Sequence, residues 1–379
     1  MKNGWQTKAL GSLCDVLDHR RKPITKSDRE AGEYPYYGAS GVLDHVAEYL
    51  FDEPLVLVGE DGAKWASGES TAFAVSGKIW VNNHAHVLRP HRGQLIDQWL
   101  IFHLNHSDLS AFVSGLTVPK LNQGNLREIP VPVPPLAEQE RIIGVLDEAF
   151  EGIATAKANA EKNLENARAL FESELNAVFT QRGSGWVEKH LNDVGAAQTG
   201  STPKTSDRDN YGDFIPFIKP ADFNTDGSLD CENDGLTKKG FSAARKIAAG
   251  SVLMVCIGAT IGKCGYCERD ITANQQINAL TPSDGSSHRF LYYQMLTEVF
   301  QRSVIHGSGQ ATLPIINKSK WSALPVWLPP TLVEQEQIAS KFDLLMAETQ
   351  RLKSIYQSKV DALDALKKSL LHEAFSGNL

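Results

Sequence analysis

The chain has 379 residues, a formal net charge of −7 and 42% hydrophobic residues. This length is enough for two or three domains that each bury a core of their own. No apolar run reaches the length of a membrane span, and the N-terminal residues lack the apolar core of a signal peptide. Five scattered cysteines fit a reducing compartment better than a disulfide framework, so we expect a cytoplasmic protein without membrane partners.

The distribution of charge argues against strong binding of nucleic acid by this chain alone. The net charge is −2 over residues 1–137, −4 over residues 138–182, zero over residues 183–332 and −1 over residues 333–379. No segment forms a broad basic surface of the kind that neutralises phosphates. If the chain reads DNA, a partner has to supply much of the electrostatic attraction.

Residues 1–137, the first module, contain a short buried strand followed by a glycine loop. The strand is predicted at residues 55–58 (LVLV) and the loop at residues 59–62 (GEDG). A polar cluster follows at residues 82–86 (NNHAH). Together these features predict a mixed module with polar loops beside a compact core.

Residues 138–182 are predicted to form one long helix with a narrow apolar seam. Apolar residues recur there at alternating spacings of three and four, which is typical of a coiled coil. Residues 333–379 repeat this pattern about 196 positions later. The predicted seam includes Leu146, Phe150, Ile153, Lys157, Leu164, Phe342, Met346, Lys353, Tyr356, Val360 and Leu363. Lys157 and Lys353 occupy equivalent positions, where a polar residue either fixes the register or extends its amine to solvent.

Residues 183–332, the second module, repeat the plan of the first. A strand at residues 252–255 (VLMV) leads into a glycine loop at residues 258–262, and a polar cluster follows at residues 274–278 (NQQIN). The ends of the modules are more similar than their middles. Residues 129–140 (IPVPVPPLAEQE) and residues 324–336 (LPVWLPPTLVEQE) both lead from a proline-rich stretch into a long helix.

This duplicated order predicts an α+β protein with two similar modules separated by two long helices. Both seams need partners. Antiparallel pairing of the two helices within one chain is the economical solution, and pairing between two copies of the chain is the alternative. Two modules with the same overall plan but different polar residues in their central parts are suited to recognising two different targets.

The duplicated exit pattern, Leu/Ile-Asn followed by Ile/Leu-Pro-Val and Glu-Gln-Glu, resembles the specificity (S) subunits of type I restriction–modification systems. The resemblance extends over essentially the whole chain. It implies two target recognition domains (1–137 and 183–332), each reading half of a split asymmetric DNA site. It also implies two spacer helices (138–182 and 333–379), paired antiparallel within the chain, that dock methyltransferase subunits.

The same resemblance implies a non-catalytic chain with partners that perform the chemistry. Two methyltransferase subunits would hold S-adenosylmethionine, and restriction subunits, where present, would hold ATP and magnesium. No Asn/Asp-Pro-Pro-Tyr/Phe motif is present, because Val133 precedes the proline pair. Residues 258–263 imitate a phosphate-binding loop but have three residues between the glycines instead of four.

Candidate DNA contacts in the first module are side chains that donate to phosphates or read base edges. They are Arg20, Arg21, Lys22, Tyr37, Ser40, Lys64, Asn82, Asn83, His84 and His86. The alternatives are a solvated basic loop and a polar segment that braces the glycine loop. A metal site at the histidines is not expected, because neither has a cysteine or acid at ligand spacing.

Candidate contacts in the second module lie on loops with small hydroxyls, amides and lysines. They are Ser201, Thr202, Lys204, Lys219, Asp222, Lys263, Gln275, Gln276, Ser308 and Gln310. Lys120, Asn122 and Asn317 belong to the repeated exit pattern, and a feature shared by both modules cannot encode two sequences. We therefore interpret them as structural or phosphate-positioning.

The sequence leaves a zinc site and three other functions to weigh. Cys264 and Cys267 form one close pair, whereas a structural zinc site usually needs two, so we expect small buried residues without a metal. The chain could instead be a coiled-coil scaffold without a DNA function, or an enzyme that holds a cofactor at residues 258–263. Within the family, it could serve a two-subunit system that cuts on both sides of its site.

Overall fold

The computed structural model describes residues 4–115, 117–309 and 313–379. It divides into two compact units, one of Met1–Ala160 with Ser358–Leu379 and one of Glu161–Gln357. Each unit combines one globular module with parts of two long helices, α3 (Leu136–Gln181) and α9 (Leu332–Ser376). Across the described ranges, no helix has both the length and the hydropathy of a membrane span.

The central sheet of the first module is antiparallel. Its strands follow the order β2 (Cys14–Val16), β9 (Ala85–Pro90), β6 (Leu55–Gly59) and β7 (Ala72–Val75). β6 is buried along its whole length, which confirms the predicted strand and explains its unbroken run of apolar residues. Helix α1 (Asp97–His106) packs against β6 and β7.

The first module has a second sheet, and its strand β8 ends directly before the polar cluster at residues 82–86. Its order is β4 (Gly41–Val46), β3 (Ala31–Gly38), β8 (Lys78–Val81) and β5 (Phe51–Asp52), with β3 and β8 parallel. Separately, β1 (Gln6–Ala9) pairs with β10 (Pro130–Val133), so the module begins and ends at one place. The short elements are η1 (Leu10–Ser12), η2 (Asp18–Arg20), η3 (Lys26–Asp28), η4 (Ser110–Phe112) and α2 (Gln123–Glu128).

The second module has an equivalent central sheet. Its order is β12 (Gly195–Thr199), β18 (Ile277–Pro282), β15 (Ser251–Val255) and β16 (Cys264–Cys267). A smaller sheet has the order β14 (Gly235–Leu236), β13 (Tyr211–Ile218) and β17 (Thr272–Ala273), and β11 (Val187–His190) pairs with β19 (Pro325–Leu328). The helices and turns are α4 (Leu191–Val194), η5 (Arg208–Asn210), η6 (Pro220–Asp222), α5 (Lys238–Ser242), α6 (His288–Leu296), α7 (Glu298–Ser308) and α8 (Lys318–Ser322).

The two central sheets agree in register as well as in strand order. Val58 of β6 faces His86 of β9, and Met254 of β15 faces Asn278 of β18. β2 and β12 occupy the same edge beside β9 and β18. Because strand order and register coincide, positions in one module can be matched with positions in the other.

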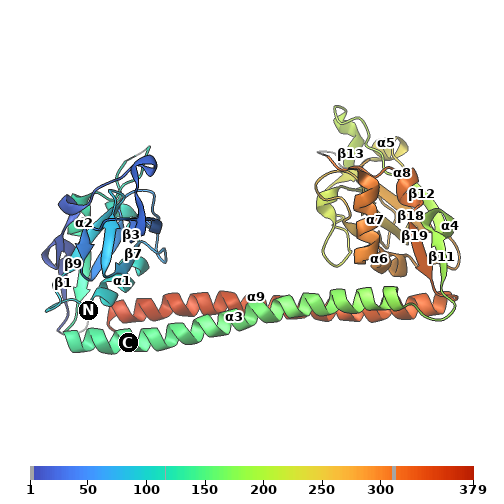
Figure 1. The fold of residues 1–379 in the computed structure, drawn as a ribbon. Helices are drawn as coiled ribbons and strands as arrows, with labels where there is room; N and C mark the ends of the chain where they lie inside the picture. The colour runs from blue at the N-terminus through green and yellow to red at the C-terminus, as the bar shows by residue number, and fades with distance from the viewer. Residues whose placement is uncertain (1–3, 116, 310–312) are drawn as a thin grey trace. The chain divides into compact units, whose positions relative to one another are not determined.

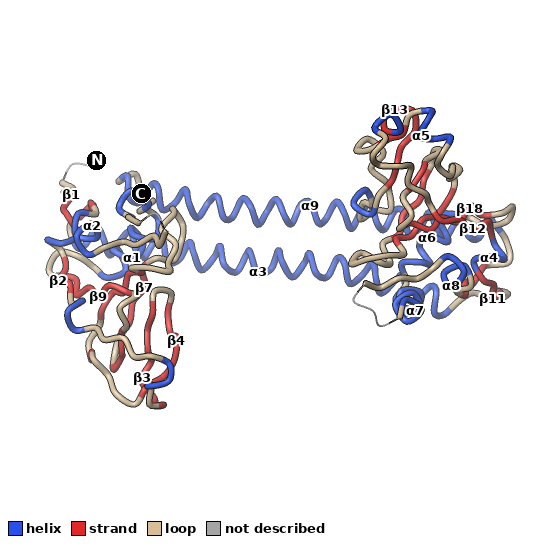
Figure 2. The backbone as a smooth tube through the Cα atoms, turned by 90° about the horizontal axis from the view of Figure 1, so that it is seen from above, coloured by secondary structure: helices blue, strands red, loops and turns tan. Residues whose placement is uncertain are grey.

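The long helices pair antiparallel, as Figures 1 and 2 show. In the first unit, Leu146 near the start of α3 shares an apolar cluster with Leu371 near the end of α9. In the second unit, Phe171 near the end of α3 packs against Phe342 near the start of α9, with ring centroids 6.2 Å apart. Pairing within the chain is therefore confirmed, and a second copy is not needed to cover either seam.

The structure places the seam residues at different depths. Leu146, Ile153 and Phe342 are buried, whereas Phe150, Lys157, Leu164, Met346, Tyr356, Val360 and Leu363 are half-buried. Lys157 Nζ lies 2.8 Å from Asp364 on the facing helix, a half-exposed ion pair worth at most about 1 kcal/mol. Lys353 is exposed and Leu352 is half-buried instead, because a helix of 3.6 residues per turn drifts from a strict 3.5-residue seam.

Candidate nucleic-acid interface

Several of the predicted DNA contacts of the first module are accessible. Arg20, Lys22, Ser40, Lys64, Asn83 and His84 are exposed, and Tyr37 is half-buried beside the Phe73 ring. Ser40 lies in the turn between β3 and β4, Lys64 follows the glycine loop, and Asn83 and His84 precede β9. The imidazole of His84 pairs with Asp61 of the glycine loop, which joins two of these segments.

The basic run at residues 20–22 is split between the surface and the interior. Arg20 is held against the module, donating to the Leu50 carbonyl at 2.9 Å and lying over the Phe51 ring at 4.6 Å. Arg21 turns inward, donating to the Ala85 carbonyl at 2.8 Å and pairing with Glu60. The Lys22 side chain is exposed. The run is therefore not one continuous phosphate clamp.

A buried charged cluster lies beneath these loops. His86 Nδ1 lies 2.6 Å from Asp18 Oδ2, and His86 Nε2 lies 2.7 Å from the carbonyl oxygen of Leu121. Glu60 pairs with Arg21 and, at 2.8 Å, with Lys120. Burial tends to raise the pKa of the Asp18 carboxyl, but its hydrogen bond to His86 and the nearby positive charges outweigh burial and lower that pKa.

This cluster ties together segments that are far apart in the sequence. Asp18 begins η2, Glu60 opens the glycine loop, and Lys120 precedes the exit helix α2. Asn82 and His86, predicted as base-reading residues, are buried within it or beside it. Asn82 accepts a hydrogen bond from the His84 backbone at 2.8 Å. Both side chains brace the loops from inside, and neither is available to a DNA groove.

The second module has neutral residues at the equivalent positions. Asn278 matches His86 by the strand register given above. Thr199 matches Asp18, because Asp18 lies two residues after Val16, which pairs with Leu88, and Thr199 lies two residues after Ala197, which pairs with Leu280. Thr199 Oγ1 donates to Asn278 Oδ1 at 2.8 Å. One frame therefore carries a charged cluster in the first module and an uncharged hydrogen bond in the second.

The glycine loops are held to the exit patterns in the same way. Leu121 N donates to the Glu60 carbonyl at 2.8 Å, and Ile316 N donates to the Cys256 carbonyl at 3.0 Å. Cys256 therefore stands where the first module has Glu60. Burial raises the pKa of the Cys256 thiol to about 12, so the residue is a neutral counterpart of the glutamate.

The charged cluster does not suit a metal ion. Asp18, Glu60 and His86 form the one candidate metal-binding group among the described residues. Both ring nitrogens of His86 already contact oxygen atoms, and Arg21 and Lys120 already balance the carboxylates. The cysteines of the second module belong to no such group within the described ranges, and Cys256, Cys264 and Cys267 are buried.

The predicted contacts of the second module also divide into accessible and internal side chains. Thr202, Lys204, Lys263 and Gln275 are exposed, Ser201, Lys219 and Gln276 are half-buried, and Asp222 and Ser308 are buried. The hydroxyl of Thr202 donates to the side chain of Gln275, which brings two loops together. Gln310 lies outside the described residues.

Three predicted contacts of the second module have internal partners. Asp222 accepts from the Lys219 backbone at 2.7 Å and from Asn233 at 3.0 Å. Lys219 Nζ lies 2.6 Å from Asp234, and Ser308 Oγ donates to the Ile305 carbonyl at 2.8 Å. Because Asp222 caps the turn η6 from a buried position, its oxygen atoms cannot accept from cytosine without a rearrangement of this turn.

The repeated exit asparagines are helix N-caps. Asn122 accepts from the Asn125 backbone at 2.9 Å at the start of α2, and Asn317 accepts from the Lys320 backbone at 2.9 Å at the start of α8. Such caps stabilise a helix by about 0.5–2 kcal/mol. The structure therefore favours the structural interpretation of both residues, and Lys120 is paired with Glu60.

Comparison with known proteins identifies the family behind this architecture. The pattern of the type I restriction modification DNA specificity domain matches residues 2–166 and again residues 183–357. The chain belongs to this family. Each match covers one module and the first part of the long helix that follows it.

Individual relatives agree over different lengths. The Haemophilus influenzae protein S.HindORF215P is 36% identical over 140 residues, which cover 37% of this chain and 36% of that protein. The HindI specificity subunit of the same organism is 27% identical over 58% of this chain and 51% of its own length. The chain thus spans about a third to a half of these two relatives. The EcoDI specificity subunit of Escherichia coli is 22% identical over 99% of this chain and 88% of its own length.

Solved structures share the fold. A chain from a study of complex assembly and conformational transition of the type I R-M system has a TM-score of 0.76 and 20% identity, with 100% of this chain and 99% of that chain covered. The HsdS subunit of Thermoanaerobacter tengcongensis has a TM-score of 0.60 and 18% identity, with 100% and 98% covered.

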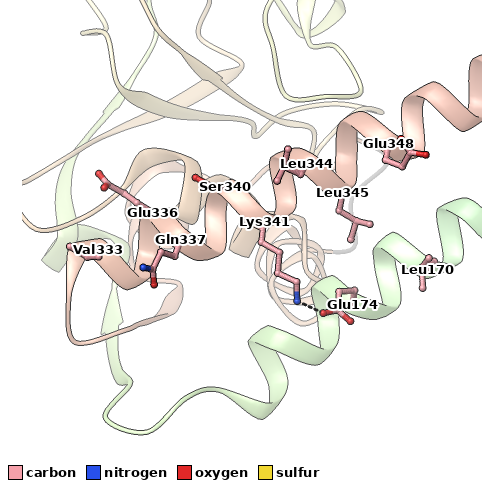
Figure 3. A pocket seen from close by; sticks show the side chains of 10 residues that line it. All are labelled: Leu170, Glu174, Val333, Glu336, Gln337, Ser340, Lys341, Leu344, Leu345 and Glu348. Atoms are coloured by element: carbon pink, nitrogen blue, oxygen red, sulfur yellow. Dashed lines mark hydrogen bonds and ion pairs between the residues drawn. The ribbon is translucent and has the colours of Figure 1, made fainter.

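The second unit also contains an apolar groove that the sequence patterns did not predict. It has a volume of about 890 Å³ and lies between the end of α3 and the start of α9 (Figure 3). Leu170, Val333 and Leu344 line it and are 63%, 63% and 75% exposed. Lys341 pairs with Glu174 across it. These leucines and the valine lie off the seam, and their apolar character at exposed helix positions was the signal that could have identified them.

Proposed function

We propose that this chain is the DNA-recognition subunit of a type I restriction–modification complex and that each module reads one half of a bipartite, asymmetric site. One observation carries the proposal. The two modules share strand order, register and exit geometry, but the loops they present differ in chemistry. Equivalent frames with different loops suit two half-sites of different sequence. The chain itself performs no methylation or cleavage.

The exposed loop residues are the proposed reading surface. In the first module these are Lys22, Ser40, Lys64, Asn83 and His84, and in the second they are Thr202, Lys204, Lys263 and Gln275. Amides and hydroxyls read base edges through hydrogen bonds, and lysines contact guanine or phosphate. Asn82, His86, Asp222 and Ser308 are left out of this surface, because they are buried.

The helical pair is the proposed spacer and dock. Antiparallel pairing gives each module an equivalent position at the junction of one helix start and one helix end, so two methyltransferase subunits can dock in related ways. The groove at Leu170, Val333 and Leu344 is the proposed contact for one of them, since exposed apolar patches of this kind commonly mark protein interfaces. The methyltransferases would hold S-adenosylmethionine, and restriction subunits would hold ATP and magnesium.

The test is to reconstitute the chain with its methyltransferase and to map the methylated positions in genomic DNA. We expect methylation at one split sequence with two unlike halves. Asn83→Ala should relax discrimination within one half only, and Gln275→Ala within the other, because each residue lies in a different module. Methylation of a continuous or symmetric site by the complex would contradict the proposal.

A matched control uses an exposed residue away from both reading surfaces. Gln181 is exposed at the end of α3, and Gln181→Ala should leave the recognised sequence of both half-sites unchanged. The alternative of a coiled-coil scaffold predicts that addition of the methyltransferase produces no sequence selectivity, so the same assay separates the two functions.

A further inference from the structure

The central glutamine of the first Glu-Gln-Glu motif links the long helix to its module. Gln139 is fully buried. Its Oε1 accepts from the backbone N–H of Ile96 at 2.9 Å, and its Nε2 donates to the carbonyl of Gln94 at 2.8 Å. The same Nε2 lies 2.9 Å from the carbonyl of Pro134. Ile96 is the residue that precedes helix α1, so one side chain holds the start of α3 against the start of α1.

The second module repeats the two hydrogen bonds that Gln139 makes with the loop before α1. Gln335 is 1% exposed. Its Oε1 accepts from the backbone N–H of Ser287 at 2.9 Å, and its Nε2 donates to the carbonyl of Gly285 at 3.0 Å. Ser287 precedes helix α6. In both modules the acceptor carbonyl lies two residues before the donor N–H, so the two glutamines grip the same loop in the same way.

An amide is the side chain that this geometry requires. Glutamine offers one acceptor and one donor group in a single plane, whereas a carboxylate offers acceptors only and an aliphatic side chain offers neither. Two hydrogen bonds from one rigid plane fix an angle as well as a distance. The flanking glutamates are less buried: Glu138 and Glu334 are half-buried, and Glu140 and Glu336 are exposed. The fully buried member of each motif is therefore the glutamine.

We propose that Gln139 and Gln335 are positioning residues that fix the orientation of each specificity domain on its helix and thereby set the spacer length that the complex accepts. This inference rests on the proposed function. The glutamines contact no DNA in this proposal. A domain that tilts about its junction shifts its reading loops along the duplex, so loss of the amide should relax the choice of spacer and leave the half-site sequences unchanged.

The experiment measures methylation by the reconstituted complex on DNA duplexes with fixed half-sites. The half-sites and native spacer are first mapped with the unmodified complex. The duplexes then carry the native spacer or one that is longer or shorter by one or two base pairs. Gln139→Leu and Gln335→Leu remove the two hydrogen bonds that the glutamines share, and Gln139→Leu also removes the bond to Pro134, at similar side-chain volume. Gln139→Glu and Gln335→Glu keep the acceptor and lose the donor. Gln181→Leu makes the same change at an exposed position.

We expect the preference for the native spacer over the altered spacers to fall about tenfold in each leucine variant, equivalent to about 1.4 kcal/mol. That is the net contribution of one or two hydrogen bonds. The glutamate variants should show a smaller relaxation in the same direction. Gln181→Leu should keep the native preference. Discrimination between correct and mismatched half-sites should be unchanged in all five proteins.

A purely stabilising role predicts something else. A weakened fold lowers methylation on every spacer by the same factor and leaves the preference intact. If the leucine and glutamate variants fold and keep the native spacer preference, the inference is overturned. It is also overturned if all four junction variants fail to fold, because the amides then serve folding alone. If instead the unmodified complex has no spacer optimum, it is the proposed function that fails.

Discussion

At the scale of single residues, the two modules place a charged set and a neutral set of side chains at equivalent, buried or half-buried positions. The first uses Asp18, His86 and Glu60, and the second uses Thr199, Asn278 and Cys256. A buried ion pair gains little over a neutral replacement, but the loss of one partner leaves an uncompensated charge. The first module should therefore tolerate paired changes in this cluster better than single ones.

His86→Asn, which introduces the residue of the second module, should destabilise the first unit by roughly 3 kcal/mol, because the Asp18 carboxylate loses its shortest buried contact and keeps Arg21, at 3.4 Å, as its charged partner. The double variant Asp18→Thr with His86→Asn copies the neutral pair and should recover most of this loss. Hydrogen exchange of first-module amides such as that of Val87, which donates to Asp18 Oδ1 at 2.9 Å, measures the effect. Equal protection of this amide in the wild type and the single variant would argue against the role of the pair.

His103 of α1 should make the first unit sensitive to mild acid. Its Nε2 lies 2.8 Å from the Pro130 carbonyl, and burial lowers the pKa of its imidazole from 6.5 to about 4. Since the unfolded chain takes up the proton first, the contribution of neutral His103 is fully present above about pH 6.5 and is lost as the pH falls toward 4. The loss amounts to roughly 3 kcal/mol over this range.

Pulse-labelling hydrogen exchange of α1 across a urea series, repeated at pH 7 and pH 5, measures this dependence. His103→Gln keeps a donor for the Pro130 carbonyl and removes the titrating group, so its urea midpoint should change less between the two pH values. His45 is exposed on β4, and His45→Gln is the matched control, which should keep the pH dependence of the wild type. Identical pH dependence in wild type and His103→Gln would show that another group is responsible.

The sequence could not predict these residue-scale contacts, although it contained their members. Asp18, His86 and Leu121 meet only through the register of β2, β9 and the exit loop. A pattern of polar residues marks a loop but does not say which side chains point inward. For this reason Asn82, His86 and Asp222 were predicted to contact DNA and are buried instead.

At the scale of elements, prediction from the sequence was more successful, because periodicity reports directly on burial. The strand at residues 55–58, the strand at residues 252–255 and both long helices are present. The predicted seam positions face the partner helix where large apolar residues such as Leu146 and Phe342 pack. At Lys353 the prediction is off by one residue, because Leu352 is the half-buried residue there. The groove was missed because its leucines lie outside the repeat that defined the seam.

The helical pair should act as a ruler whose length can be changed. Seven residues inserted after Lys157 and seven inserted in α9 beside its ion-pair partner Asp364 keep the seam in phase. They lengthen the pair by about 10.5 Å, which corresponds to about three base pairs of duplex. We expect the methylated site to gain about three base pairs of spacer with both half-sites unchanged, as read by genome-wide mapping of methylation. A seven-residue insertion in α3 alone is the control, and it should impair folding. Altered half-site sequences in the double insertion would exclude a ruler.

At the scale of the whole molecule, net charge limits how strongly this chain alone can attract DNA. The net charge of −7 has no compensating basic domain, and several cations that the sequence offered for phosphate binding are paired internally, including Arg21 with Glu60, Lys120 with Glu60 and Lys219 with Asp234. Specific readout by exposed loops is compatible with this balance, but a strong electrostatic hold is not. Affinity should therefore belong to the complex.

The dependence of DNA binding on salt tests this division of labour. Each phosphate neutralised by a protein contributes about −0.9 to the slope of log affinity against log salt concentration. The chain alone should show weak binding with a shallow slope, and addition of the methyltransferase should steepen the slope and introduce sequence preference together. Titrations by fluorescence anisotropy at several salt concentrations, with a duplex carrying scrambled half-sites as the control, measure both quantities. A steep slope with tight, sequence-specific binding by the chain alone would show that its exposed lysines suffice, and the partner would then be needed for chemistry only.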